Sequence, residues 1–310
     1  MNPPSDATGH HPAPAPIHLG LASALCLLAA ALSLSACGGA GAQSSNQPPR
    51  SGEIIENKGS DTLVNLALAW AEAYMESRPE VRISVTGGGS GTGIAALING
   101  TVDIANASRR MKLEEVEAAE SNGISPVEFV VARDAIAIVV HPSNPVNQLT
   151  FQQISDIYTG RITNWQDVGG ENRPVVLLSR ESNSGTYVYF LENVVRMGDE
   201  ESDLLFSPGA LLMPSSEGIT AEVSDNPNTI GYDGLGYVTP EQKVVAVACD
   251  ASGPFVLPSV DSVNDGSYPI ARPLYMYSAG EPTVQAAAFL DWVMGEGQTV
   301  VPELGFVPLH

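Results

Sequence analysis

The 310-residue sequence has few positively charged residues. It contains 14 Lys and Arg against 35 Asp and Glu, which gives a formal net charge of −21 at pH 7. A chain this acidic repels nucleic acid and anionic lipid headgroups at long range, so neither is an expected partner. Any anion that it binds must be held by local geometry, because the overall field opposes the approach of the anion.

Cysteine and histidine are also scarce, with three and five residues. Cys26 lies in an apolar N-terminal run and Cys37 follows that run, which leaves Cys249 as the one cysteine of the remaining sequence. A single cysteine cannot form an internal disulfide. Beyond residue 37 the sequence has only His141 and His310, so it offers no Cys/His cluster of the kind that binds zinc. We therefore expect no metal and no cofactor.

The apolar run LGLASALCLLAAALSLSA, residues 19–36, has the length of a secretory core or a short membrane span. It ends in Leu-Ser-Ala before Cys37 and two glycines, and this resembles a bacterial lipobox, whose cysteine becomes the acylated N-terminus. We predict a signal peptide over residues 1–36, lipidation of Cys37 and a flexible tether over residues 37–50. The protein is then exported and anchored to the cell membrane, on the periplasmic or outer side. The first 18 residues lack the usual Lys or Arg, and a plain transmembrane anchor is the alternative.

The rest of the sequence alternates predicted strands with predicted helices. With 44% hydrophobic residues it can build a sizeable core in one large domain or two modest ones. An apolar, β-branched run at residues 127–142 is long enough to cross between two domains. The pattern predicts an α/β architecture with mostly parallel sheets. The clearest segments are predicted helices at residues 61–78, 112–123, 186–195 and 282–295, and predicted strands at residues 81–86 and 174–180.

Three Ser/Thr/Gly clusters each stand immediately before a predicted helix. They are Gly59–Thr62, Gly89–Thr92 and Ser184–Thr186. Ser and Thr are common helix N-caps, so capping explains any one cluster. A helix N-terminus also offers free backbone N–H groups and a partial positive charge, which suit an oxyanion. Three such clusters in one chain favour a site that surrounds a tetrahedral anion.

The glycine-rich segment GGGSGTGI, residues 87–94, lacks the lysine of a P-loop, so the sequence does not predict a nucleotidase. Arg180 stands four residues before Ser184, at the end of a predicted strand, and could reach the same turn. A guanidinium presents a fixed fork of donors that suits an oxyanion. The alternative is a surface arginine that pairs with Glu181.

In these clusters and in further segments the chain resembles the substrate-binding lipoproteins of ABC-type phosphate transporters. The segments are GSDT at 59–62, GGGSGTGIAAL at 87–97, TVDIANASRR at 101–110, RDAIAIVVHP at 133–142, RESNSGTYVYF at 180–190, IGYDGLGYV at 230–238 and DGSYPIARPL at 265–274. The resemblance implies a two-lobed Venus-flytrap fold of the type II periplasmic-binding-protein kind. Each lobe would be a mixed, mostly parallel sheet flanked by helices, with a two-strand hinge. It also implies a monomer without enzymatic activity that delivers phosphate to permease subunits in the membrane.

The resemblance further implies which residues bind phosphate. They are Ser60, Asp61, Thr62, Ser90, Ser108, Arg180, Ser184, Gly185 and Thr186. Some family members place an aspartate just after the strand equivalent to TVDIANAS, where it accepts the proton of hydrogen phosphate, but here Arg109 occupies roughly that position. A carboxylate accepts a hydrogen bond from protonated phosphate and repels sulfate, which has no proton to offer. Asp61 is the remaining candidate for this role, and the alternative is an N-cap aspartate that faces solvent.

Within this fold we expect residues 51–133 and 271–310 to form lobe 1 and residues 134–270 to form lobe 2. Other functions stay open at this point. The ligand could be sulfate, molybdate, tungstate or a small phosphonate, and the chain could be a sensing or adhesive surface protein without a permease. A serine hydrolase or phosphatase would use Ser90 or Ser184 as nucleophile, and a nucleophilic serine needs a base. His141 is the one mid-chain histidine.

Overall fold

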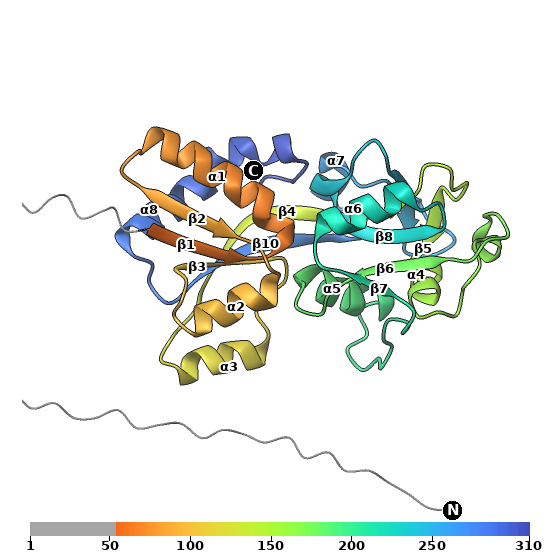
Figure 1. The fold of residues 1–310 in the computed structure, drawn as a ribbon, viewed down its shortest axis with the longest axis horizontal. Coiled ribbons are helices and arrows are strands. Elements are labelled where there is room, and N and C mark those ends of the chain that lie inside the picture. Colours follow the sequence, from red (N-terminus) through yellow and green to blue (C-terminus); the bar gives the residue numbers. More distant parts are fainter. Residues whose placement is uncertain (1–53) are drawn as a thin grey trace, which may run out of the picture. The chain divides into compact units, whose positions relative to one another are not determined.

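The computed structural model describes residues 54–310, which fold as one unit (Figure 1). The predicted signal peptide, the tether and the lipidation site at Cys37 lie outside the described residues. Among residues 54–310, no helix has both the length and the apolar character needed to cross a membrane. The strands form a sheet in the order β2-β1-β3-β10-β4-β8-β6-β7, and β9 joins β5 to β4.

The first lobe is the half of the sheet on one side of β4, with the helices that cover it. Strand β1 pairs in parallel with β2 and β3, and β10 runs antiparallel to β3 and β4. The strands are β1 (Ile54–Gly59), β2 (Arg82–Thr86), β3 (Ile104–Ala107), β4 (Val127–Val140) and β10 (Ala271–Ser278). The helices are α1 (Asp61–Ser77), α2 (Ser90–Ile98), α3 (Leu113–Ser121) and α8 (Val284–Met294).

The second lobe is built on the other half of the sheet. Strand β6 pairs in parallel with β7 and β8, β5 pairs in parallel with β9, and β8 and β9 run antiparallel to β4. The strands are β5 (Gln148–Thr150), β6 (Val176–Arg180), β7 (Leu211–Met213), β8 (Thr229–Gly234) and β9 (Lys243–Ala248). The helices are α4 (Phe151–Tyr158), α5 (Gly185–Phe190), α6 (Ser216–Asp225) and α7 (Val260–Asn264).

Strand β4 belongs to both lobes. Its residues 127–135 pair with β10 in the first lobe, and residues 136–140 pair with β8 in the second. A second connection runs beside it, because Ile136 N–H donates to the carbonyl of Ile270 just before β10 begins. Figure 1 shows β4 and the start of β10 passing between the two groups of elements. The expected two-lobed α/β fold is confirmed. The outer strand pairs are parallel and the pairs made by β4 and β10 are antiparallel, so each sheet is mixed.

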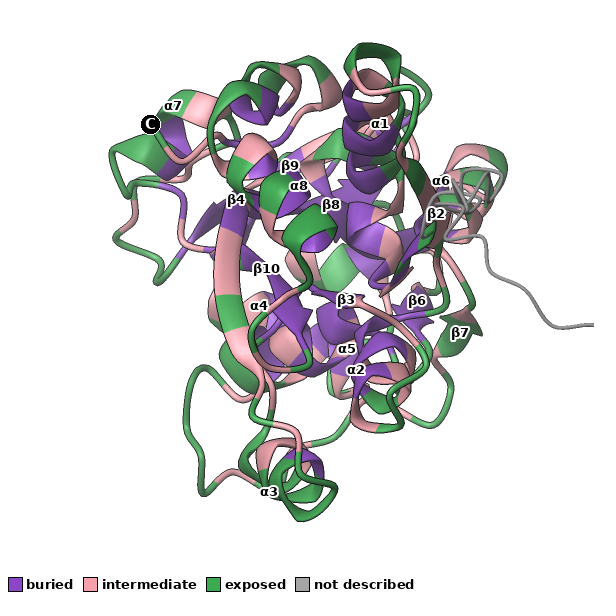
Figure 2. Ribbon diagram, turned by 90° about the vertical axis from the view of Figure 1, so that its left-hand side faces the viewer, coloured by how far each residue is buried: buried purple, intermediate pink, exposed green. Residues whose placement is uncertain are grey.

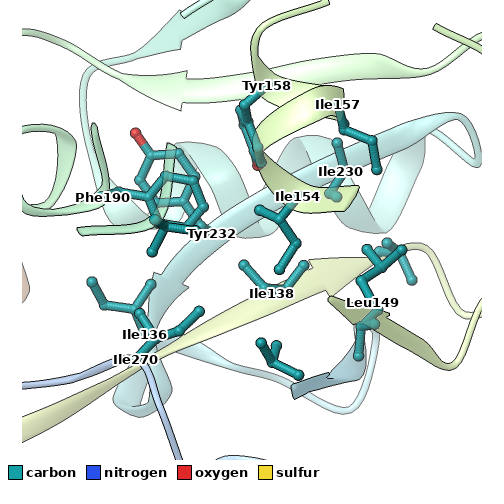
Figure 3. Close-up of a cluster of buried hydrophobic side chains, with 14 of the residues drawn as sticks. Ile136, Ile138, Leu149, Ile154, Ile157, Tyr158, Phe190, Ile230, Tyr232 and Ile270 are labelled. Carbon is teal, nitrogen blue, oxygen red and sulfur yellow. The ribbon is translucent and has the colours of Figure 1, made fainter. Parts of the chain in front are cut away.

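Each lobe has its own hydrophobic core, and both flank the central strands, which are buried along most of their length (Figure 2). In the first lobe Tyr74 of α1 packs edge-on against Phe289 of α8, and Trp70 belongs to the same cluster. In the second lobe the rings of Phe190 and Tyr232 stack on each other (Figure 3), and their centroids are 3.8 Å apart. Two separate cores allow each lobe to stay folded while the connections between the lobes bend.

Most predicted elements are confirmed, including the acidic helix α3 and the long crossing strand β4. The predicted helix over residues 186–195 is α5 followed by a π-helical turn, Leu191–Val195. Strand β1 and helix α6 were not predicted. The inward positions of β1 include Asn57, and α6 buries only Ser216, Ile219 and Val223, so neither segment carries a clear apolar period.

Candidate anion-binding site

The three Ser/Thr/Gly clusters meet between the lobes, at the N-termini of α1, α2 and α5. Ser184 acts as an ordinary N-cap, because its hydroxyl accepts hydrogen bonds from Thr186 N–H and Tyr187 N–H. Ser60, the N-cap of α1, makes no such bond, and the N-cap of α2 is Gly89, which has no side chain. Capping therefore explains the cluster at Ser184 but not the other two.

Serine hydroxyls of the first lobe lie against Gly185 of the second. The Oγ of Ser90 accepts a hydrogen bond from Ser108 N–H at 3.0 Å, and the two hydroxyl oxygens lie 3.3 Å apart. A Cβ added to Gly185 would stand 2.6 Å from the Ser108 Oγ and closer still to the Ser90 Oγ. Only glycine fits at this position, because the other lobe occupies the space that a side chain would need.

The loop before α5 also reaches across to the glycine-rich segment of the first lobe. The carbonyl of Asn183 accepts a hydrogen bond from Gly91 N–H at 2.9 Å, and its Nδ2 donates to the carbonyl of Gly88 at 2.9 Å. Gly89 has a φ of +91° and would bring a Cβ to 2.8 Å from the Asn183 carbonyl. The glycines of residues 87–91 thus permit the close approach of the two lobes.

Arg180 and Asp61 form an ion pair between the lobes. The Nη2 of Arg180 donates to Asp61 Oδ2 at 2.7 Å, while Asp61 Oδ1 accepts from Gly88 N–H at 2.9 Å. The side chain of Arg180 is 1% exposed and that of Asp61 13% exposed. Arg180 also donates to Ser216 Oγ and to the carbonyls of Met213 and Pro214. The alternative of a surface arginine is therefore wrong, and so is that of an aspartate directed at solvent.

A buried carboxyl lies behind Arg180. Ser216 Oγ accepts from Arg180 Nη1 at 3.0 Å and donates to Asp233 Oδ1 at 2.7 Å. Burial raises the pKa of Asp233 to about 7, against the opposing effects of Arg180, Ser216 and the Gly234 N–H. This carboxyl therefore binds a proton at a higher pH than an exposed aspartate does.

A second buried arginine, Arg272 at the start of β10, links the lobes on the hinge side. Its Nη2 donates to Thr62 Oγ1 of α1 at 3.3 Å and to Thr186 Oγ1 of α5 at 2.9 Å. The two hydroxyl oxygens lie 2.9 Å apart. Arg272 also donates to Asp134 of β4 through Nε and Nη2, at 3.2 and 2.9 Å. Burial raises the pKa of Asp134, and the guanidinium of Arg272 opposes that shift.

The sequence-predicted residues occupy this region in three groups of contacts, Asp61 with Arg180, Ser90 with Ser108 and Gly185, and Thr62 with Thr186. Ser60 and Ser184 are their buried chain neighbours. Arg109, which stands where some family members have an aspartate, forms two hydrogen bonds of 2.7 Å with Glu115 of α3. Its ion pair holds the first turn of α3. A guanidinium has donors and no acceptor, so Arg109 cannot take the role of that aspartate.

Sequence reasoning missed several residues of the region. They are Asp134, Asn183, Ser216, Asp233 and Arg272. Two of them carried a partial signal, since Asp134 and Arg272 are charged residues in largely apolar strands, although β4 also contains Glu128 and Arg133. Charged side chains are almost never fully buried unless they are paired, so each of these two residues predicts a buried partner of opposite charge without identifying it.

The histidine considered for a hydrolase is bonded elsewhere. His141 Nδ1 lies 2.8 Å from Ser143 Oγ and accepts from Ser143 N–H. The candidate nucleophiles are also bonded to other partners, since Ser184 caps α5 and Ser90 accepts from Ser108. These contacts give no base to either serine.

Comparison with known proteins finds matches over most of the chain. A family model described as PBP superfamily domain matches residues 42–296. The phosphate-binding protein PstS of Pseudomonas aeruginosa is 37% identical over 273 residues, covering 82% of this chain and 83% of that protein. The PstS of Bacillus subtilis is 32% identical and covers 89% of each chain. Among solved structures, one described as a phosphate ABC transporter substrate-binding protein from Clostridium perfringens, with bound phosphate, superposes with a TM-score of 0.74. It is 32% identical and covers 83% of this chain and 100% of its own.

Proposed function

The chain belongs to the family of phosphate-binding proteins within the PBP superfamily, and we propose that it binds inorganic phosphate between its lobes and delivers it to an ABC-type import permease. The observation that carries this proposal is the buried ion pair of Arg180 and Asp61 across the lobes. Arg180 offers a guanidinium to the oxyanion, and Asp61 offers a carboxylate to its proton. The surrounding donors are hydroxyls and helix N-termini.

The role of each site residue follows from its chemistry. Arg180 and the hydroxyls of Ser90, Ser108 and Thr186 would donate to phosphate oxygens, as would the backbone N–H groups at the start of α1 and the N–H of Gly185. Asp61 would accept the proton of hydrogen phosphate and reject fully ionised sulfate. Such a site holds the anion with little free positive charge, which suits reversible capture.

We assign residues 51–133 and 271–310 to lobe 1 and residues 134–270 to lobe 2. The strand pairings that support this division change partner between Ala135 and Ile136. Phosphate that is contacted by both lobes favours the closed arrangement over an open one, because it gains its second set of contacts only on closure. The closed, loaded form would be the one that the permease recognises.

Selectivity tests the assignment of both the ligand and Asp61. Calorimetric titration of the protein at pH 7.5 should show tight binding of phosphate and at least about 100-fold weaker binding of sulfate, the effect expected when a buried charged group faces an anion without a proton. Asp61→Asn should weaken phosphate binding and strengthen sulfate binding, so that the two affinities converge. Asp156→Asn removes a carboxylate from a half-exposed pair with Arg161 and should leave both unchanged. Equal affinities in the unaltered protein would remove the assignment to phosphate.

The predicted lipid anchor at Cys37 remains part of this proposal. The motif LSAC followed by two glycines supports it. Expression with labelled palmitate should label the membrane-bound protein, and Cys37→Ser should abolish the label and release protein that still binds phosphate. Membrane retention of the unlabelled Cys37→Ser variant would instead indicate a transmembrane anchor at residues 19–36.

A further inference from the structure

Arg272 offers a second guanidinium on the hinge side of the anion site. We infer that Arg272 is a positioning residue for phosphate, which orients the hydroxyls of Thr62 and Thr186 and thereby couples phosphate binding to closure of the lobes. This inference rests on the proposed phosphate-binding function. The residue lies on neither helix that supplies the hydroxyls, but on β10, where the chain returns from the second lobe to the first.

Asp134 fixes the guanidinium in place. Both side chains are buried, at 1% and 0% exposure, and the pair joins β10 to β4, the two strands that connect the lobes. Nε and Nη2 of Arg272 both donate to Asp134 Oδ2. Because the guanidinium is planar, these two contacts determine the direction in which its other N–H groups point.

The remaining contacts of Nη2 determine the roles of the two hydroxyls. An arginine has donors and no acceptor, so Thr62 Oγ1 and Thr186 Oγ1 both accept from it. The hydroxyls are also 2.9 Å apart, so one O–H donates to the other oxygen. One O–H proton is then left without a place in the cluster. This proton is available for a hydrogen bond to a phosphate oxygen. By donating to both hydroxyl oxygens, Arg272 therefore makes the threonine pair a hydrogen-bond donor to the anion.

The other terminal nitrogen of Arg272 supports a role at the anion site. Within residues 54–310, Nη1 is buried and has no hydrogen-bond acceptor. In a planar fork the outer N–H of Nη1 points parallel to that of Nη2, so it points along the edge that faces the two threonines. The ring of Tyr189 lies against the guanidinium, 5.4 Å from Cζ to the ring centre. A buried N–H without an acceptor is unfavourable, and a phosphate oxygen at this edge would satisfy it.

The cluster also depends on the position of both lobes. Thr62 is on α1 of the first lobe and Thr186 on α5 of the second, and the Nη2 of one arginine contacts both. Opening of the lobes separates the two helices, so Arg272 can keep at most one of these contacts. Its contribution to phosphate affinity should therefore appear mainly as a slower release of phosphate from the closed form.

The test compares the unaltered protein with a variant whose hinge pair is neutral. Asp134→Asn/Arg272→Gln removes both charges together, so that no buried charge is left alone. We expect this double variant to bind phosphate at least about tenfold more weakly than the unaltered protein, with most of the change in the dissociation rate measured by stopped flow. Affinities equal within about twofold would overturn the inference.

Thr186→Val distinguishes a positioning role of Arg272 from a purely structural one, through its effect on phosphate affinity in two backgrounds. Added to the unaltered protein it should weaken phosphate binding about tenfold, and added to the double variant it should have almost no effect. Full and equal effects in both backgrounds would show that Arg272 does not act through Thr186. If the double variant does not unfold cooperatively, Arg272→Lys replaces it in the test. Lysine keeps the ion pair with Asp134 but lacks the planar fork of the guanidinium. Unaltered phosphate affinity in Arg272→Lys would also overturn the inference.

Arg133→Gln is the matched control. Arg133 is the neighbouring arginine on β4, but its side chain bonds to Asn264 and to the carbonyl of Pro308, away from the threonines. Its replacement should leave phosphate affinity unchanged, and a loss equal to that of the Arg272 variants would contradict a specific role for Arg272. Absence of phosphate binding in the unaltered protein would refute the proposed function itself. Normal binding in the unaltered protein with unchanged binding in the Arg272 variants would refute only the role of Arg272.

Discussion

Replacement of Gly185 by alanine is expected to weaken phosphate binding roughly 100-fold, which corresponds to the upper end of the 1–3 kcal/mol that overpacking costs. The added methyl group would lie 2.6 Å from Ser108 Oγ and even closer to Ser90 Oγ. Both serines belong to the opposite lobe, so the collision arises only when the lobes close. Alanine is a better helix former than glycine, and α5 itself should remain intact. Calorimetric titration with phosphate measures the effect.

The control is another glycine of the second lobe. A Cβ at Gly209 would meet nothing closer than Ser207 Oγ at 3.7 Å, which is an ordinary contact. Gly209→Ala should therefore bind phosphate normally. Thermal unfolding should show that Gly185→Ala is as stable as the unaltered protein in the absence of phosphate. Wild-type phosphate affinity in Gly185→Ala would mean that the lobes do not close around the ligand at this point.

Arg180→Gln is expected to cause a loss of similar or larger size, at least about 100-fold in phosphate affinity, because a buried charge-assisted hydrogen bond and its electrostatic attraction are both removed. The substitution also leaves Asp61 without its cation, and an unpaired carboxylate would repel the phosphate anion. The affinity of Arg180→Gln for phosphate, measured by the same titration, checks this expectation.

Arg161→Gln is the control variant, because it removes one positive charge from the protein without removing a contact at the anion site. Arg161 lies in the same lobe, its side chain is 56% exposed, and it pairs with Asp156 at 3.2 Å. Exposed pairs of this kind contribute little, so phosphate affinity should change by less than about twofold. If Arg161→Gln and Arg180→Gln weakened phosphate binding equally, the effect would come from net charge and not from a contact at the site.

Local sequence patterns were sufficient to predict the fold class and the segments of the site. The apolar run of β4 is long enough to belong to two lobes, and the clusters at Ser60, Ser90 and Ser184 each precede a helix whose period is visible in the sequence. The family resemblance then related these segments to a single ligand. Each of these inferences used residues that are close together in the chain.

Contacts between distant residues could not be predicted in the same way. Arg180 is 119 residues from Asp61, and Arg272 is 210 residues from Thr62. A local pattern gives the environment of a residue but not its partner, because the partner depends on how two lobes meet. Strand β1 was missed for a related reason. Its inward-facing residue Asn57 is polar and is buried with a hydrogen bond to Asn106, so the strand lacks the apolar alternation that would have predicted it.

The most direct test of phosphate capture between the lobes is a crystal structure of the exported chain grown with phosphate. It should show one phosphate ion bonded to Arg180, with its protonated oxygen directed at Asp61, and contacts from both lobes through residues such as Ser90 and Thr186. A structure in which the interlobe site stays empty at saturating phosphate, or in which the ion touches one lobe alone, would contradict this mechanism of capture.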